Sequence, residues 1–298
     1  MSSLLRSRAR GFTVLAILAG ACAVLLYLVF VRTPIGQRWD DRAYLGSLVA
    51  SLESRQRITS ILHEIRISTL VLMVILLLVI GLLRRRFATA VITAVAFGGA
   101  VLSAEVLKRV LHRPDLAPDM NSLINESNID TFPSGHATIA TAFALGLLIV
   151  SSLRARLWIA TFGMLWAAGI STATLIAGWH RPSDLIGGIA LATAWLAAAT
   201  AFSTGRFGRI RSVGDAVRWL IPVGAGVLLL AVGVLLAWIS RGDTGQIPVG
   251  GGLAAFFAGV GIVAASAITV VGVFAYLLRD ISFGPAESAD LMNASQPN

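Results

Sequence analysis

The chain has 298 residues, of which 56% are hydrophobic and only 13% are charged. Soluble domains are roughly 45–50% apolar and about 25% charged, so these values exclude a soluble globular protein as well as a disordered chain. The net charge of +9 does not indicate a nucleic-acid partner, because the 24 basic residues are scattered at the ends of apolar stretches. The composition therefore predicts a polytopic membrane protein.

Apolar stretches long enough to cross a bilayer core, which takes about 20 residues, follow one another along the whole chain. They are continuously apolar, whereas barrel strands alternate every second residue, so helices are expected. The predicted fold is all-α with eight transmembrane helices, at 11–31, 65–83, 87–111, 136–153, 156–179, 183–203, 218–239 and 252–278.

The first apolar stretch follows Arg6, Arg8 and Arg10, as a signal peptide would. It continues to Val31, longer than the roughly 7–15 apolar residues of a cleaved signal, so we expect an uncleaved helix. A lipoprotein cleavage site at Cys22 is the alternative. Cys22 is the single cysteine, which excludes an intrachain disulfide and a cysteine-built metal site.

Basic residues predict the orientation of the chain in the cell membrane. Arg84, Arg85 and Arg86 lie directly at a helix end, as positive charges do on the cytoplasmic side. Both termini are then cytoplasmic, and the polar segments 32–64 and 112–135 lie on the extracytoplasmic side. The first of these segments is expected to be partly helical and to lie on the membrane surface.

The predicted organisation has three parts. Residues 1–204 form a six-helix core, residues 205–280 add a pair of transmembrane helices, and residues 281–298 form a disordered cytoplasmic tail.

Three polar clusters fall at helix ends on the outer side of the membrane, where polar residues are candidates for function. They are Lys108-Arg109 with His112-Arg113-Pro114, then Pro133-Ser134-Gly135-His136, and finally His180-Arg181-Pro182-Ser183-Asp184.

The second and third clusters each have a chemical interpretation. A proline followed by small residues before an apolar run leaves backbone N–H groups at a helix start, where Ser134 and Gly135 would let a phosphate approach. Asp184 falls four residues after His180, so its carboxylate can hold one ring nitrogen and leave the other free as a nucleophile or base.

The first cluster supplies positive charge for a phosphoryl group, from Lys108 and Arg113. Taken singly, each feature has an ordinary explanation: an interfacial histidine, a turn, a lipid anchor. Their shared placement favours one site. Two histidines with Asp184 could also hold a metal ion, but the Ser-Gly and Lys-Arg elements would then have no purpose, so no metal is expected.

At these residues the sequence resembles the type 2 phosphatidic acid phosphatase (lipid phosphate phosphatase) superfamily, over roughly residues 87–204. The family carries Lys, six residues, Arg-Pro; then Pro-Ser-Gly-His; then Ser-Arg, five residues, His, three residues, Asp. The second signature is complete at 133–136, and the third has its His180 and Asp184.

The resemblance implies a role for each matching residue and no cofactor. His180 would be the nucleophile that forms a phosphohistidine, with Asp184 as its orienting partner. His136 would protonate the leaving group and then activate water. Lys108 and the N–H groups of 134–136 would hold the phosphate oxygens.

Two signature arginines are displaced. Asp115 stands where the first signature has its arginine, and Arg113 comes two residues early. Thr174 stands where the third signature has its arginine. Arg181, directly after the proposed nucleophile, is the expected substitute for the missing charge.

The predicted function is a membrane phosphatase that acts on a polyprenyl phosphate or diphosphate, or on a phosphatidate-like lipid, through a phosphohistidine. The alternatives are a lipid phosphotransferase that uses the same site and a catalytically silent lipid-binding or transport protein. The sequence indicates no protein partner.

Overall fold

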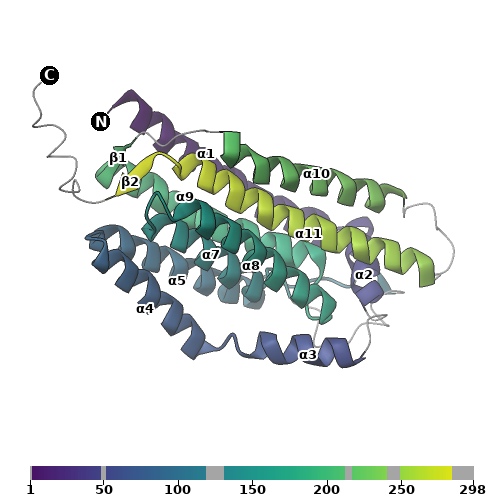
Figure 1. Ribbon diagram of the computed structural model, residues 1–298. Coiled ribbons are helices and arrows are strands. Elements are labelled where there is room, and N and C mark those ends of the chain that lie inside the picture. Colours follow the sequence, from purple (N-terminus) through teal and green to yellow (C-terminus); the bar gives the residue numbers. More distant parts are fainter. Residues whose placement is uncertain (1, 48–51, 119–130, 212–216, 240–248, 284–298) are drawn as a thin grey trace, which may run out of the picture.

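The chain folds into a bundle of long helices with one small two-stranded sheet (Figure 1). The computed structural model describes residues 2–47, 52–118, 131–211, 217–239 and 249–283. In chain order the elements are α1 (Ser3–Leu26), η1 (Tyr27–Val31), α2 (Pro34–Gly46), α3 (Leu52–His63), α4 (Ile67–Leu83), α5 (Phe87–Val110), α7 (Gly135–Val150), α8 (Arg156–Ile176), α9 (Pro182–Phe207), β1 (Gly208–Ile210), α10 (Val217–Ile239), α11 (Val249–Leu278) and β2 (Ile281–Phe283).

The predicted all-α membrane class is confirmed, but the count of eight spans is not. Every predicted apolar stretch is helical, yet among the described residues five helices are long and apolar enough to cross a membrane, or six if α3 and α4 form one span bent by 58°. The other two, α7 and the part of α10 over Leu220–Leu235, are shorter apolar helices. The helix α7 falls short because its 16 residues extend about 24 Å, less than the ~30 Å hydrocarbon core.

The short helix α7 lies in the middle of the bundle and packs against α5, α8 and α9. Almost all of its side chains are buried, from Ala137 to Val150. Because protein rather than lipid surrounds α7, its length does not have to match the bilayer. It begins at Ser134, whose side chain accepts a hydrogen bond from the backbone N–H of Ala137.

One end of the bundle carries β1, β2 and the start of α1 (Figure 1), and Arg8 and Arg86 contact Asp280 and Ser282 there. The buried Arg156 donates to the carbonyl oxygens of Leu278 and Ile281, which fixes the end of α11. The first three residues of the tail predicted at 281–298 are not disordered, because Ile281–Phe283 is a strand paired with β1. The rest of that predicted tail lies outside the described residues.

The helix α11 is part of the bundle core. It packs against α2, α7, α8 and α9 as well as against α10. The predicted division at residue 205 places α10 and α11 outside the core. Because α11 helps to build that core, the division cuts through it.

The opposite end of the bundle carries α2 and α3, which occupy the predicted outer segment 32–64 (Figure 1). Thr33 caps α2 by accepting from the N–H of Gly36, and Pro34 stands in its first turn. The inner face of α2 is buried and brings in Asp40 and Asp41. The segment is therefore largely helical, and its two helices differ, since α2 inserts into the bundle and α3 is more exposed; a position on the membrane surface stays a prediction.

Candidate active site

The start of α9 holds the predicted pair of His180 and Asp184. Pro182 begins the helix, and one oxygen of Asp184, Oδ2, accepts from the N–H of Arg181 at 3.0 Å and from the hydroxyl of Thr131 at 2.5 Å. Nδ1 of His180 lies 3.6 Å from the same oxygen, just beyond hydrogen-bond length. Both side chains are buried, and the carboxylate thus lies beside one nitrogen of the ring, which a small shift would bring into hydrogen-bond distance.

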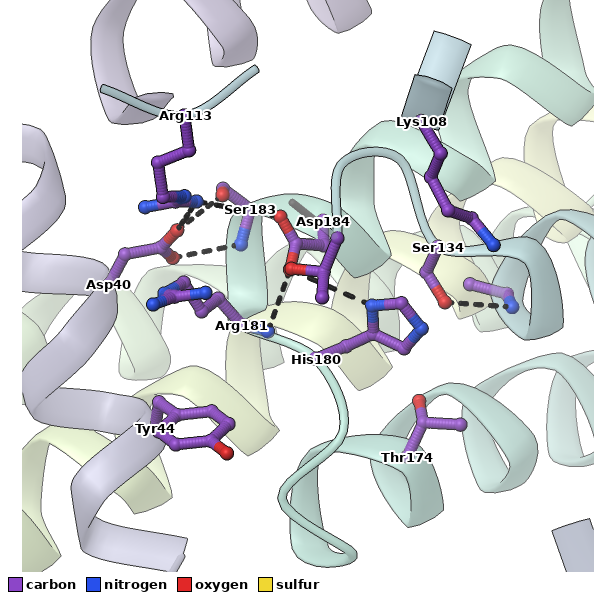
Figure 2. A network of polar contacts seen from close by, with 12 residues as sticks. Asp40, Tyr44, Lys108, Arg113, Ser134, Thr174, His180, Arg181, Ser183 and Asp184 are labelled. Carbon is purple, nitrogen blue, oxygen red and sulfur yellow. Dashed lines mark hydrogen bonds and ion pairs between the residues drawn. The ribbon is translucent and has the colours of Figure 1, made fainter. Parts of the chain in front are cut away.

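The other side of the imidazole faces the Pro-Ser-Gly-His turn. Figure 2 shows the His180 ring between Asp184 and Ser134, with its second nitrogen turned away from the carboxylate. Two hydrogen bonds hold the start of α7 against α9: the backbone N–H of Ser134 donates to the carbonyl oxygen of Asp184 at 2.8 Å, and the hydroxyl of Thr138 donates to that of Gly188 at 3.2 Å.

Gly188 makes this close packing of α7 on α9 possible. A Cβ at this position would lie 2.5 Å from the carbonyl oxygen of Ser134 and 2.9 Å from the hydroxyl of Thr138. Any larger residue would separate the two helix starts, and with them the two halves of the site.

The helix start of α7 offers two backbone donors where the sequence predicts three. Since the N–H of Ser134 is already bonded to Asp184, a phosphate contact from Ser134 would come from its hydroxyl. Within the described residues, the N–H groups of Gly135 and His136 have no hydrogen-bond partner. They point out of the first turn, as anion-binding N–H groups do.

Lys108 lies beside this turn, as predicted, but it has a partner that the sequence analysis missed. Its Nζ is 2.9 Å from Oε1 of Glu105, one turn earlier on α5. A Cβ on Gly135 would lie 3.3 Å from this Nζ and 3.1 Å from this Oε1, so both charges face the turn. We call His180, Lys108 and the 134–136 turn the His180 side of the site.

The two predicted arginines lie on the other side of Asp184 (Figure 2). Nε of Arg181 is 2.5 Å from Asp41, and Arg113 is 3.1 Å from Asp40 and 3.5 Å from Asp184. All these side chains are buried. We call Asp40, Asp41, Arg113 and Arg181 the Asp40 side of the site. Phosphate binding by Arg113 and Arg181 stays a prediction, and their acidic partners favour a structural role.

Asp40 is the centre of the Asp40 side. It accepts from the N–H of Ser183 at 3.0 Å and from the Ser183 hydroxyl, and it pairs with Arg113. The pKa of Asp40 is raised to about 6: burial is the largest cause and the charge of Asp184 adds to it, while Arg113 and the hydrogen bonds from Ser183 lower the pKa. This carboxylate from α2 is thus tied directly to the first turn of α9.

Arg181 also packs beneath Tyr44. The guanidinium carbon lies 5.4 Å from the centre of the Tyr44 ring, and the Tyr44 hydroxyl donates to the carbonyl oxygen of Gly178 at 2.7 Å. Gly178 has a φ of 71°, a conformation that favours glycine and turns the chain from α8 toward His180. The helix α2 therefore also supports the loop that carries the predicted nucleophile.

Thr174 does not replace the arginine of the third signature, because its side chain is uncharged and too short to extend into the site. It is fully buried on α8 beneath His180 (Figure 2), and its hydroxyl donates to the carbonyl oxygen of Ser171 at 2.7 Å. The His180 side therefore has one cation, Lys108, among the described residues.

The helix α3 covers the remaining histidine of the predicted site. Nε2 of His136 lies 3.4 Å from the carbonyl oxygen of Leu62, at the end of α3. The Trp179 ring contacts both His136, at 5.4 Å between ring centres, and His63, at 5.1 Å. The sequence analysis missed His63, because it lies outside the three clusters and only the fold brings it here.

Residues 87–207 match the family model of the PAP2 superfamily. No curated protein and no solved structure matches the chain. The matched segment extends from the first residue of α5 to the last residue of α9. It contains the whole His180 side, whereas Asp40 and Asp41 come from α2, outside the match.

Proposed function

Residues 87–207 belong to the PAP2 superfamily, and on this premise we propose that the chain is a membrane phosphatase that hydrolyses a lipid phosphate. One observation carries the proposal: the His180 ring stands between a buried carboxylate and the open N–H groups of a helix start. In that arrangement the His180 ring can attack a phosphorus atom while the N–H groups of the helix start bind the phosphate oxygens.

In the first step, Nε2 of His180 attacks phosphorus, the N–P bond forms and the P–O bond to the lipid breaks. Asp184 holds Nδ1–H and stabilises the positive ring that results. The N–H groups of Gly135 and His136, together with Lys108, hold the phosphoryl oxygens.

His136 completes the reaction as acid and then base. Burial lowers the pKa of His136 to about 4, so the negative charge of the bound substrate phosphate has to keep its ring protonated. With Nε2–H held by the carbonyl oxygen of Leu62, Nδ1–H of the protonated ring then gives its proton to the leaving alkoxide. The same nitrogen then takes a proton from water, which attacks phosphorus and releases inorganic phosphate from His180. Both His180 and His136 return to their starting states.

A lipid substrate is supported by the position of the site. It lies at one end of a bundle whose outer side chains are largely apolar, for example Leu102 and Val110 on α5, which are 66% and 64% exposed. A polyprenyl phosphate or diphosphate, or a phosphatidate-like lipid, would place its head group there while its chain stays in the bilayer.

A catalytically silent lipid-binding protein is the second candidate, and a specific observation favours it. Thr174 carries no charge, and each buried arginine of the Asp40 side has an acidic partner. Such a protein would bind a lipid phosphate without turning it over.

The purified protein should release inorganic phosphate from a dispersed polyprenyl phosphate or phosphatidate, and His180→Ala should release none. With His136→Ala, acid-labile phosphate should accumulate on the protein, because the water attack lacks its base. A silent protein would bind the lipid and show neither result. If an added alcohol became phosphorylated in preference to water, the site would be that of a phosphotransferase.

We propose that the site faces away from the cytoplasm, because the cluster Arg84, Arg85 and Arg86 lies between α4 and α5 at the opposite end of the bundle. In a Cys22→Ala background, Gln56→Cys on α3 should react with an impermeant thiol reagent in intact cells. Arg209→Cys, exposed beside β2, should react only after lysis. The opposite pattern would place the site in the cytoplasm.

A further inference from the structure

An apolar cavity of about 530 Å³ lies behind the active site, between the end of α1, η1, α2, α9, α10 and α11. Its size is in the range of ligand sites, which are about 300–1,000 Å³. We propose that this cavity binds one hydrocarbon chain of a membrane lipid, at a site separate from that of the substrate.

Small side chains create the cavity. Ala43 of α2 and Ala255, Ala258 and Gly259 of α11 line it, and no larger side chain of the described residues fills the space between them. A Cβ on Gly259 would lie 2.9 Å from the ring of Pro182, so at this point α11 already touches the start of α9. The helices are therefore in contact at the cavity wall, and they cannot close further to fill the cavity.

The cavity opens on the outer surface of the bundle. Val29, Ile35 and Val234 line it and are 48%, 76% and 53% exposed. Val29 lies in η1, which ends the apolar span Ser3–Val31, and Val234 lies on the apolar helix α10, whereas Ile35 lies on α2 at the end of the bundle. At this surface the surrounding medium is the bilayer, so hydrocarbon chains are what the opening meets.

Water is a poor occupant of this cavity. A buried water needs two to four polar partners, but the few polar groups here are already bonded. Asp40 is held by Ser183 and Arg113, and Thr33 donates to the carbonyl oxygen of Val29. An empty space would cost the lining atoms their dispersion contacts, which a hydrocarbon chain restores.

The substrate chain does not reach the cavity from His180. Asp40 and Ser183 line the cavity, and Asp184, Arg113 and the rest of the Asp40 side lie between them and the histidine, all buried. A chain in the cavity would instead pack on Pro182 and Ser183, the first residues of the helix that holds Asp184.

The proposal is tested in phosphatidylcholine vesicles that contain a small fraction of the same lipid with a photoreactive diazirine in its chain. After irradiation of the reconstituted full chain, peptide mapping should find labels concentrated at the cavity residues of η1, α10 and α11. Because this readout needs no turnover, it is independent of the proposed phosphatase activity.

Two pairs of variants make the test specific. Val234→Trp and Val29→Trp fill the cavity from different walls, and we expect each to lower the cavity label by about tenfold. The controls Leu228→Trp and Leu25→Trp add the same side chain at exposed positions that do not line the cavity, and they should leave the label unchanged.

If all lipid-facing helices were labelled uniformly and the filling variants had no effect, the proposal would be overturned in favour of ordinary boundary lipid. Absence of label in the cavity would also overturn it, and a raised melting temperature in both filling variants would then indicate an empty space. A lowered melting temperature with no label would indicate that a segment of protein occupies it.

Discussion

The two sides of Asp184 carry similar residue types in opposite settings. On the His180 side, Lys108 and Glu105 are 26% and 48% exposed at the side chain, and the N–H groups of the α7 start are open. On the Asp40 side, Arg113 and Arg181 are buried against carboxylates. A basic residue next to a signature residue in sequence therefore does not have to face the substrate.

The two sides differ because buried basic side chains need acidic partners, whereas exposed ones can be solvated by water. A buried guanidinium needs an acidic partner, because leaving one charge of a buried pair unpaired is costly. On the Asp40 side α2 provides these partners, so the arginines hold α2 to the start of α9. The partly exposed Lys108 can exchange Glu105 for a phosphate. Phosphate binding is therefore expected on the His180 side.

The largest effect is expected at Asp184, which belongs to both sides. Asp184→Asn should lower kcat by about 10³–10⁴-fold, because an amide cannot stabilise the charged ring and leaves it misoriented. Phosphate release from a lipid phosphate measures this. The control Thr131→Val removes one hydrogen bond to Asp184 and should cost about tenfold at most. A normal kcat in Asp184→Asn would contradict the assignment of His180 as the nucleophile.

The next effect concerns the only cation of the His180 side among the described residues. Lys108→Met should lower kcat/KM by about 10²-fold, the typical cost of losing one donor to a phosphoryl or oxyanion group. Arg109→Met is the matched control, because it removes the neighbouring exposed charge without touching the turn. If both variants lost activity equally, the lysine would act only through the general surface charge.

On the Asp40 side a change should affect folding more than turnover. Arg181→Met leaves Asp41 buried without its partner and should destabilise the protein by about 3–5 kcal/mol, seen as a lower melting temperature in detergent. The double variant Arg181→Met with Asp41→Asn should recover part of that loss.

The kinetics of the same variant distinguish the two roles of Arg181. For the folded fraction of Arg181→Met, kcat/KM should change by no more than about threefold. A tenfold loss at unchanged melting temperature would instead support the phosphate role predicted from the sequence.

The local features of this protein could be read from its sequence. The apolar stretches predicted where helices lie, and the Pro-Ser-Gly-His turn predicted an open helix start, because both depend on neighbouring residues. The partners of Arg181 and Ser183 could not be predicted, since Asp41 and Asp40 are 140 and 143 residues away. The outcome of the span count had a similar cause: α7 is surrounded by other helices, which length alone does not reveal.

The smallest effect is expected at Glu105. Because this residue pairs with Lys108, it makes the His180 side resemble the Asp40 side. Its carboxylate is the acidic partner of Lys108 among the described residues, and it occupies this lysine beside the turn that would bind phosphate. A bound phosphoryl group has to take over the lysine and lie near a like charge. Two unit charges at 4 Å repel by about 1 kcal/mol in water, which corresponds to about fivefold in affinity.

Glu105→Gln keeps the shape of the side chain and removes its charge. We therefore expect the inhibition constants of vanadate and of inorganic phosphate to fall by about fivefold, with a smaller change in kcat. Glu64→Gln, which removes an exposed carboxylate paired with Arg66 near the end of α3, should change neither constant. Weaker inhibition in Glu105→Gln would show the opposite role: the carboxylate would then hold Lys108 in its binding position, and the His180 side would depend on an acidic partner much as the Asp40 side does.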